Sequence, residues 1–346
     1  MRVIFCAKPT EASTAVQIMN SPKRFFSIFL LFCLVFATSV FPVRLSAERD
    51  DLESSWILLE KAKSLIAEPG GQRMGEALEL LRKAIEERAI FPEAEIAIGE
   101  IYFREGALEL AKEQLAKVLK KEYRDVLRVR EEAYAVLYRL AEINERQGEY
   151  GSMEKRLLEV LNAHPVYAQP ESQRLRTAML KAYLVRGLDQ VFRLYRLDNA
   201  GFALSAYSKL GWFYYRWGRF EPASIMHSLF ALDIMISEAV AEIRRFSPMY
   251  EFKTLEDFLD VAMKRENVRD YLVASDFFRV AYYLAAATFA AGHPSRASET
   301  FRLLAASRAP AADIGPYRDL ARKQLKSPWV EPYLNPSARR IEYPAD

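Results

Sequence analysis

The sequence predicts an all-α protein built from stacked antiparallel helix pairs, an α-solenoid. Alternating β-branched runs and Asn-Gly hairpin signals are nearly absent, which argues against strands. Apolar residues recur instead every three or four positions, as between Ala77 and Ile85, and this spacing is typical of amphipathic helices. Small residues and glycines also recur at fixed distances along the chain, which indicates a structural repeat.

The first 47 residues have the layout of a secretory signal. Lys23 and Arg24 precede an apolar run over residues 25–43, and the small residue Ala47 comes just before a charged stretch. We expect cleavage after Ala47 and export of the remainder to the periplasm, with Met19 as the start of a more ordinary signal. The alternative is an uncleaved signal anchor in the inner membrane, because the run approaches the ~18–20 residues that cross a bilayer.

Without residues 1–47 the chain is nearly neutral and has no cysteine. The whole sequence has 49 basic and 46 acidic residues, of which five basic and one acidic residue belong to the signal. The remaining 44 basic and 45 acidic residues give a net charge of about −1, which does not support nucleic-acid binding. Cys6 and Cys33 both lie in the signal, so neither disulfides nor cysteine metal sites are expected in the exported body.

The repeat is clearest in two copies with the same spacing. At distances of 3, 7, 12 and 16 from Gly99 stand Tyr102, Gly106, Ala111 and Leu115. At the same distances from Gly211 stand Tyr214, Gly218, Ala223 and His227. With two weaker copies, the matches span about residues 92–125, 134–167, 204–237 and 278–311.

This spacing resembles the tetratricopeptide repeat (TPR) family, in which about 34 residues form two antiparallel helices. The glycine at the fifteenth position would let the chain turn between the helices. Divergent units are expected over residues 52–90, 173–203 and 238–277, so that residues 48–325 would form one solenoid with a concave and a convex face. Residues 326–346 are expected to form an extended tail, because four prolines occur among the last 20 residues, and to dock on the last helices through Trp329 and Tyr333.

No sequence pattern supports catalysis, a metal site or a cofactor. The chain has no HExxH, GxSxG or GxGxxG motif and no phosphate-binding GxxxxGK(S/T) motif. His164 and His293 each precede a proline and are expected at helix caps or in solvent, whereas His227 is expected in the core. We therefore expect a protein that is not an enzyme and acts through recognition.

The resemblance implies a groove lined by positions 2, 5, 9, 12 and 13 of the first helix of each repeat. Among the candidates on this stripe, four come from the copy that begins at residue 204: Ser208, Trp212, Tyr215 and Arg216. The others come from the remaining copies: Phe103, Arg104, Tyr138, Arg146, Tyr282 and Phe289. Together they would form an aromatic, mildly cationic groove for a protein segment.

Two structural alternatives remain open for these residues. Arg104 and Arg146 each follow a glutamate, Glu100 or Glu142, by four positions, a spacing that favours an ion pair on the helix surface. The aromatic rings would alternatively pack against a neighbouring repeat or against the tail.

The leading functional interpretation is a periplasmic scaffold or adaptor that mediates protein–protein interactions in an envelope-associated assembly, with other envelope proteins as partners. One alternative is a small-ligand-binding partner of a solute transporter, which would need an enclosed apolar cavity. Another is a cell-wall-associated enzyme on a helical superstructure, for which only residues 238–277 leave room.

Overall fold

The computed structural model describes residues 43–68, 73–129, 131–169, 172–197, 200–218, 221–335 and 337, with side chains from residue 54 onward. The chain divides into two compact units, residues 1–54 and 55–346. Helix α1 (Val43–Ala67) begins in the first unit and runs without a break through Ala47, where cleavage was expected. The apolar run of the expected signal or anchor lies outside the described residues.

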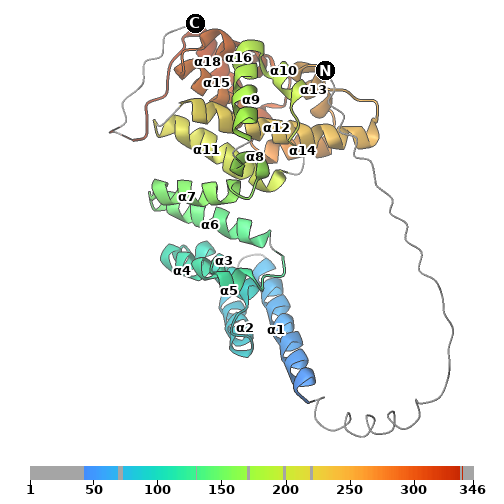
Figure 1. Ribbon diagram of the computed structural model, residues 1–346, viewed down its shortest axis with the longest axis vertical. Helices are drawn as coiled ribbons and strands as arrows, with labels where there is room; N and C mark the ends of the chain where they lie inside the picture. Colours follow the sequence, from blue (N-terminus) through green and yellow to red (C-terminus); the bar gives the residue numbers. More distant parts are fainter. Residues whose placement is uncertain are drawn as a thin grey trace, which may run out of the picture. The chain divides into compact units, whose positions relative to one another are not determined.

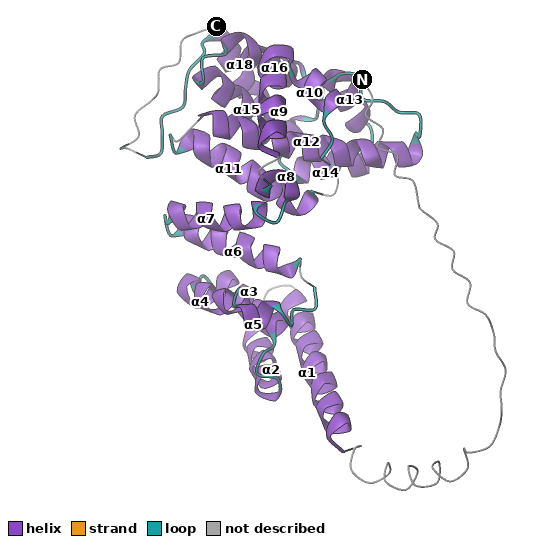
Figure 2. Ribbon diagram, in the orientation of Figure 1, coloured by secondary structure: helices purple, strands orange, loops and turns teal. Residues whose placement is uncertain are grey.

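Across the described residues the structure consists of helices, turns and loops, and it has no strand (Figure 2), so the all-α prediction is confirmed. After α1 the helices are α2 (Met74–Glu87), α3 (Pro92–Arg104), α4 (Leu108–Val118), α5 (Lys121–Arg124), α6 (Glu132–Arg146), α7 (Tyr150–Leu161), α8 (Pro165–Ala168), α9 (Ser172–Arg186), α10 (Leu188–Leu194), the 3-10 turn η1 (Gly201–Ala203), α11 (Leu204–Arg216), α12 (Glu221–Phe246), α13 (Leu255–Ala262), α14 (Glu266–Ala274), α15 (Phe277–Ala290), α16 (Pro294–Ala306), α17 (Ala311–Ile314) and α18 (Tyr317–Lys326).

Four helix pairs coincide with the four repeat matches: α3–α4, α6–α7, α11–α12 and α15–α16 (Figure 1). The turn of each pair contains a glycine with a φ between 71° and 85°, namely Gly106, Gly148, Gly218 and Gly292. A residue with a Cβ atom adopts this left-handed backbone conformation at a cost, which explains why glycine recurs in these turns. The helices of each pair pack together, and successive pairs touch through α4 and α6, α7 and α11, and α11 and α15.

Small residues allow close contact inside a pair. A Cβ atom on Gly99 of α3 would lie only 2.6 Å from the Cγ and Cδ2 atoms of Leu115 in α4. Leu115 is fully buried, so the missing side chain of Gly99 makes the space that the leucine fills.

The divergent unit expected over residues 173–203 does not form a layer between the neighbouring pairs. Helix α7 contacts α11 directly, whereas α9 packs against α10 and α12. The buried hydroxyl of Tyr183 on α9 is 2.9 Å from Thr288 Oγ1 on α15. Because α10 has only seven residues, it is too short to complete a two-helix layer, and the pair covers the α12 and α15 bundle instead.

Helix α12 is the central helix of this bundle. Of its 26 residues, 17 are buried, and it contacts α9, α11, α14 and α15. By length and composition it is the one helix in the described part of the chain that would suit a membrane span, but 83% of its most apolar window is buried by protein. Its apolar character therefore fits a core helix.

The buried apolar side chains form three separate clusters. One joins α1, α2 and α3, a second joins α3, α4 and α6, and the large third cluster extends from α6 to α18. Tyr102 packs against the first two clusters, and Leu119 packs against the second and third.

Candidate functional site

Helix α11 carries four of the ten candidate residues, and its contact with α12 fixes its position. A Cβ atom on Gly211 would lie 2.5 Å from Ser228 Oγ and 3.2 Å from the Ser228 main-chain nitrogen. At the same contact, Ser224 Oγ donates a 2.7 Å hydrogen bond to the Gly211 carbonyl. This contact places the last turn of α11, with Tyr215 and Arg216, next to the start of α12.

Most aromatic residues around Gly211 are packing residues. Phe213 is buried, and its ring stacks on Trp217 with ring centroids 5.8 Å apart. Tyr150 of α7 covers Trp217 at 4.4 Å, and the Tyr214 hydroxyl donates to Glu154 of the same helix at 3.0 Å. These rings therefore join the α11–α12 pair to the α6–α7 pair.

The C-terminal tail lies against α18, α11 and α12. Residues 328–335 are not helical (Figure 1, after α18). Gln324, on the last turn of α18, holds Trp329 by both main-chain groups: its Oε1 accepts from Trp329 N at 3.0 Å, and its Nε2 donates to Trp329 O at 3.1 Å. The docking of Trp329 thus uses main-chain hydrogen bonds.

Tyr215 and Arg216 hold the next part of the tail. Glu331 N donates to the Tyr215 hydroxyl at 3.1 Å, and the Glu331 carboxylate forms an ion pair with Arg216. Leu334 N donates to the main-chain carbonyl of Arg216 at 2.6 Å. We call this site, formed by Tyr215, Arg216, Glu221 and Gln324, the tail groove.

Glu221, the first residue of α12, completes the tail groove. Its Oε1 accepts a 2.7 Å hydrogen bond from the Tyr333 hydroxyl. Both expected anchors, Trp329 and Tyr333, therefore contact helices, although Tyr333 reaches the start of α12 and not one of the last helices.

Only three of the ten candidates meet at this site. Tyr282 is fully buried and joins it through Gln324, whose Nε2 is 3.4 Å from the Tyr282 hydroxyl. Tyr215 is only 1% exposed, so it does not offer the open aromatic surface that was expected. Trp212 and Phe289 are half-buried against the third cluster, and Ser208 is half-buried on α11.

The remaining four candidates lie in contacts between other helices. Arg139 and Arg146 both lie over the Phe103 ring, at 4.1 and 4.3 Å from its centroid. Arg146 pairs with Glu142 at 2.7 Å, as the helical spacing predicts.

Arg104 and Tyr138 join different helices. Glu100 pairs with Arg139, whereas Arg104 donates to the Ile66 carbonyl near the end of α1 at 3.2 Å. The Tyr138 hydroxyl donates to the Phe202 carbonyl at 2.5 Å. These contacts give the four residues a structural role in joining helices, and they do not bring them to the tail groove.

The sequence reasoning missed Gln324 and Glu221. Gln324 is 1% exposed in a helix whose other side chains are largely charged, and this buried position was not visible in the residue pattern. Glu221 was not singled out by the sequence pattern. A buried glutamate at the start of a helix is a weak local signal, because acidic residues are common at helix N-termini for electrostatic reasons.

Two histidines are buried in an aromatic cluster next to α11. His227 Nδ1 lies 2.7 Å from the Ala223 carbonyl, which can only accept, so Nδ1 carries the proton. His227 is 2% exposed, which confirms its expected place in the core, and this burial lowers its pKa to about 4. His164 stands at the N-cap position of α8, as expected, but its side chain makes no capping hydrogen bond. It is buried, with Nδ1 2.8 Å from the Tyr207 hydroxyl, so the alternative of a solvent position was wrong.

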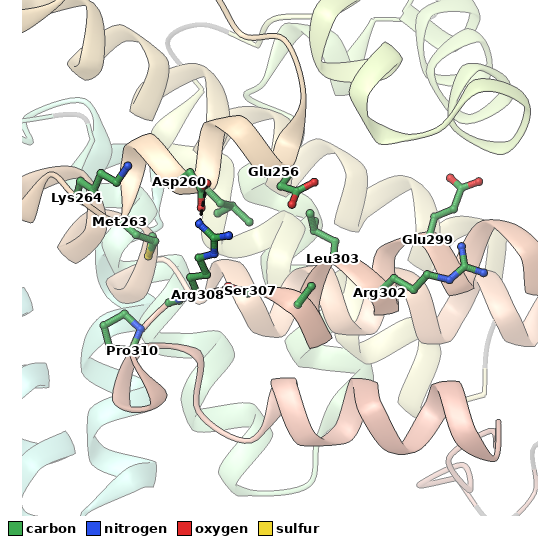
Figure 3. A pocket seen from close by; sticks show the side chains of 13 residues that line it. Glu256, Asp260, Met263, Lys264, Glu299, Arg302, Leu303, Ser307, Arg308 and Pro310 are labelled. Carbon is green, nitrogen blue, oxygen red and sulfur yellow. Dashed lines mark hydrogen bonds and ion pairs between the residues drawn. The ribbon is translucent and has the colours of Figure 1, made fainter.

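A separate cleft of about 570 Å³ lies between α13 and α16 (Figure 3). Leu259 and Leu303 line its apolar part, and charged side chains of both signs surround it, including the Arg308–Asp260 pair at 3.8 Å. In the described part of the chain, this cleft included, no three His, Cys, Asp or Glu residues are grouped so that they could hold a metal ion.

Comparison with known proteins gives distant relatives. No model of a known protein family matches the chain. An uncharacterized protein of Borreliella burgdorferi is 25% identical over 299 residues, which cover 79% of this chain and 90% of the relative. An uncharacterized protein of Treponema pallidum is 28% identical over 175 residues, and the match spans about half of each chain, 50% and 46%. The similarity to the first relative therefore extends over most of the helical body.

Proposed function

We propose that the chain is a non-catalytic adaptor with TPR-like helix pairs, exported to the periplasm, that binds segments of other envelope proteins. The observation that carries the proposal is the tail groove, which holds a non-helical stretch of polypeptide mainly by its backbone. Grooves on helical repeat proteins commonly bind extended segments in this way, because the stacked helices supply a large surface.

The sequence pattern supports the TPR-like part of the proposal. Glycines occupy the turns of four helix pairs at the expected spacing, and Gly99 and Gly211 lie at close helix contacts. Export rests on the order of basic, apolar and small residues before residue 48. The membrane-anchored form would present the same body to the periplasm.

Mild crosslinking in whole cells followed by purification of the full chain tests the proposal. We expect other envelope proteins to be recovered in stoichiometric amounts, and recovery to fall at least fivefold when Trp212→Ala and Arg216→Ala are combined. A matched control replaces a tryptophan and an arginine away from the tail groove, Trp56 and Arg128, whose guanidinium carbon lies 5.2 Å from the Trp56 ring. Equal recovery with both double variants, at unchanged helicity, would contradict the proposal.

The same experiment separates the two alternative functions. A solute-transporter partner would be recovered with a small molecule that leaves on denaturation, and the charged cleft between α13 and α16 is then the place to look for it. A cell-wall enzyme would release fragments from purified cell wall, which the scaffold would not.

A further inference from the structure

The tail groove forms hydrogen bonds with main-chain atoms of its occupant at Trp329, Glu331 and Leu334. Gln324 pairs with the N–H and C=O of Trp329, and Tyr215 accepts from the N–H of Glu331. These groups are common to every amino acid, so they select an extended backbone and not a particular side chain. The site therefore has the chemistry of a peptide-binding groove.

Two side-chain contacts add selectivity. Arg216 requires a carboxylate at the position of Glu331, and the carboxylate of Glu221 requires a hydroxyl or another donor at the position of Tyr333. The residue between them, Pro332, has no N–H, and its ring favours an extended backbone before binding. The preferred occupant is an extended segment with an acidic residue, then proline, then tyrosine.

The present occupant can leave without unfolding the helices. Its described residues come after α18 and lie outside every described helix, so its release breaks none of the helical hydrogen bonds that the structure describes. Trp329, Glu331 and Tyr333 are half-buried, and Pro332 and Leu334 are exposed, so the tail lies on the surface. Surface segments with few buried contacts open most readily.

We propose that the tail groove is an exchangeable peptide site, in which the chain's own tail occupies the place of an extended acidic–proline–tyrosine segment of a partner protein. This inference rests on the proposed adaptor function. It adds the chemistry of the partner segment and assigns the chain's own tail as a competitor for the same groove. The tail of a second copy is not the occupant, because the covalently attached tail has the same sequence and a millimolar effective concentration. A partner segment must match the groove better than the tail does.

A fluorescent peptide with the sequence of residues 327–335 is the probe, and its binding to the full chain is measured by polarisation. Glu331→Arg should weaken the attached tail and lower the apparent Kd of the peptide at least about tenfold relative to wild type, since the competitor is removed. The matched control is Glu60→Arg, the same charge change at an exposed position of α1, which should leave the Kd unchanged.

A charge exchange isolates the role of Arg216. Combining Arg216→Glu with Glu331→Arg restores an ion pair of opposite polarity between groove and attached tail. A peptide that carries Glu331→Arg matches this groove but competes with the attached tail, so it should bind the double variant at about the weak wild-type level. The native peptide should bind the double variant more weakly than it binds the wild type, because its glutamate faces the introduced carboxylate. If Glu331→Arg lowers the helicity, Tyr333→Phe serves in its place, with an expected gain in peptide affinity of about threefold.

Failure to bind the peptide in a folded Glu331→Arg or Tyr333→Phe chain would overturn the inference and make the tail a permanent part of the fold. A concentration-dependent dimer that Arg216→Glu abolishes in sedimentation would overturn it as well, because a second copy would then be the occupant. Either result leaves recovery of envelope proteins by crosslinking unaffected. Conversely, if the peptide exchanges with the tail but crosslinking recovers no envelope protein, the adaptor function is refuted and the exchangeable site is not.

Discussion

Replacing Gly211 by alanine should destabilise the protein, because α11 and α12 touch at this residue. The new Cβ atom would lie 2.5 Å from Ser228 Oγ and 3.2 Å from Ser228 N, with the Ser224 carbonyl oxygen at 3.5 Å. The Ser228 hydroxyl can rotate away, but its main-chain nitrogen can move only together with α12. The two helices must therefore separate by a few tenths of an ångström.

The expected loss follows from two opposing effects. Overpacking a close contact costs about 1–3 kcal/mol, and a contact with main-chain atoms places Gly211 in the upper part of that range. Alanine is more favourable than glycine in a helix interior by about 1 kcal/mol, which offsets part of the cost. The free energy of unfolding should fall by about 1–2 kcal/mol, which corresponds to a decrease in Tm of roughly 2–6 °C in a chain of this size.

Thermal unfolding followed by circular dichroism at 222 nm measures this change, and Gly75→Ala is the matched control. Gly75 lies in the first turn of α2 with no atom within 4 Å of its added Cβ, so alanine should raise the stability by up to about 1 kcal/mol. A Gly211→Ala protein as stable as the Gly75→Ala protein would refute the argument that close contact selects glycine at the helix pair.

Two further predictions concern His227 and the start of α13. The pKa of His227 is lowered to about 4, so between pH ~6.5 and ~4 the unfolded chain binds a proton more readily than the folded chain. The free energy of unfolding should therefore fall by up to about 3 kcal/mol as the pH decreases through this interval. Urea unfolding of His227→Gln should show a correspondingly flatter pH dependence, and an unchanged slope would contradict this. At the start of α13, Thr254 Oγ1 accepts a hydrogen bond from Asp257 N at 3.1 Å. In urea unfolding, Thr254→Ala should lower the free energy of unfolding by about 1 kcal/mol, whereas Thr254→Ser, which keeps the hydroxyl, should lower it little. Equal losses of stability in the two variants would show that this capping hydrogen bond is unimportant.

The helix pairs could be predicted because their signals are local. The matches at 92, 134, 204 and 278 begin within two residues of α3, α6, α11 and α15. The turn glycine needs a positive φ, and small residues such as Gly211 mark the helix contact, so both are visible in a single sequence. The family resemblance itself stays a prediction.

The order of packing could not be predicted, because it depends on contacts between distant residues. The hydrogen bond from Tyr183 to Thr288 joins positions 105 residues apart, and it places α9 on the bundle and not in the stack. Helical spacing placed Phe103 and Arg216 on the same face of the first helix of their repeats. The neighbours that cover these stripes, Arg139 for Phe103 and Glu331 for Arg216, are set by the tertiary structure.

The candidate site was predicted in part. Tyr215 and Arg216 were singled out by their positions on the predicted groove stripe, and the partner of Arg216 proved to be the carboxylate of Glu331. Docking of the tail had been considered as an alternative. The clamp of Gln324 on Trp329 had no sequence signal, since it depends on how the chain turns after α18.

The division of the apolar interior into three clusters has a consequence for how the protein unfolds. Cooperative unfolding requires that the loss of one contact weakens many others, but beyond the shared helix α3, Tyr102 is the one described side chain that packs against both the first and the second cluster. In repeat proteins, weak coupling of this kind lets terminal layers open before the rest. The amide hydrogens of α2 should therefore exchange with solvent through local openings, whereas those of α12 should exchange only when the whole bundle comes apart.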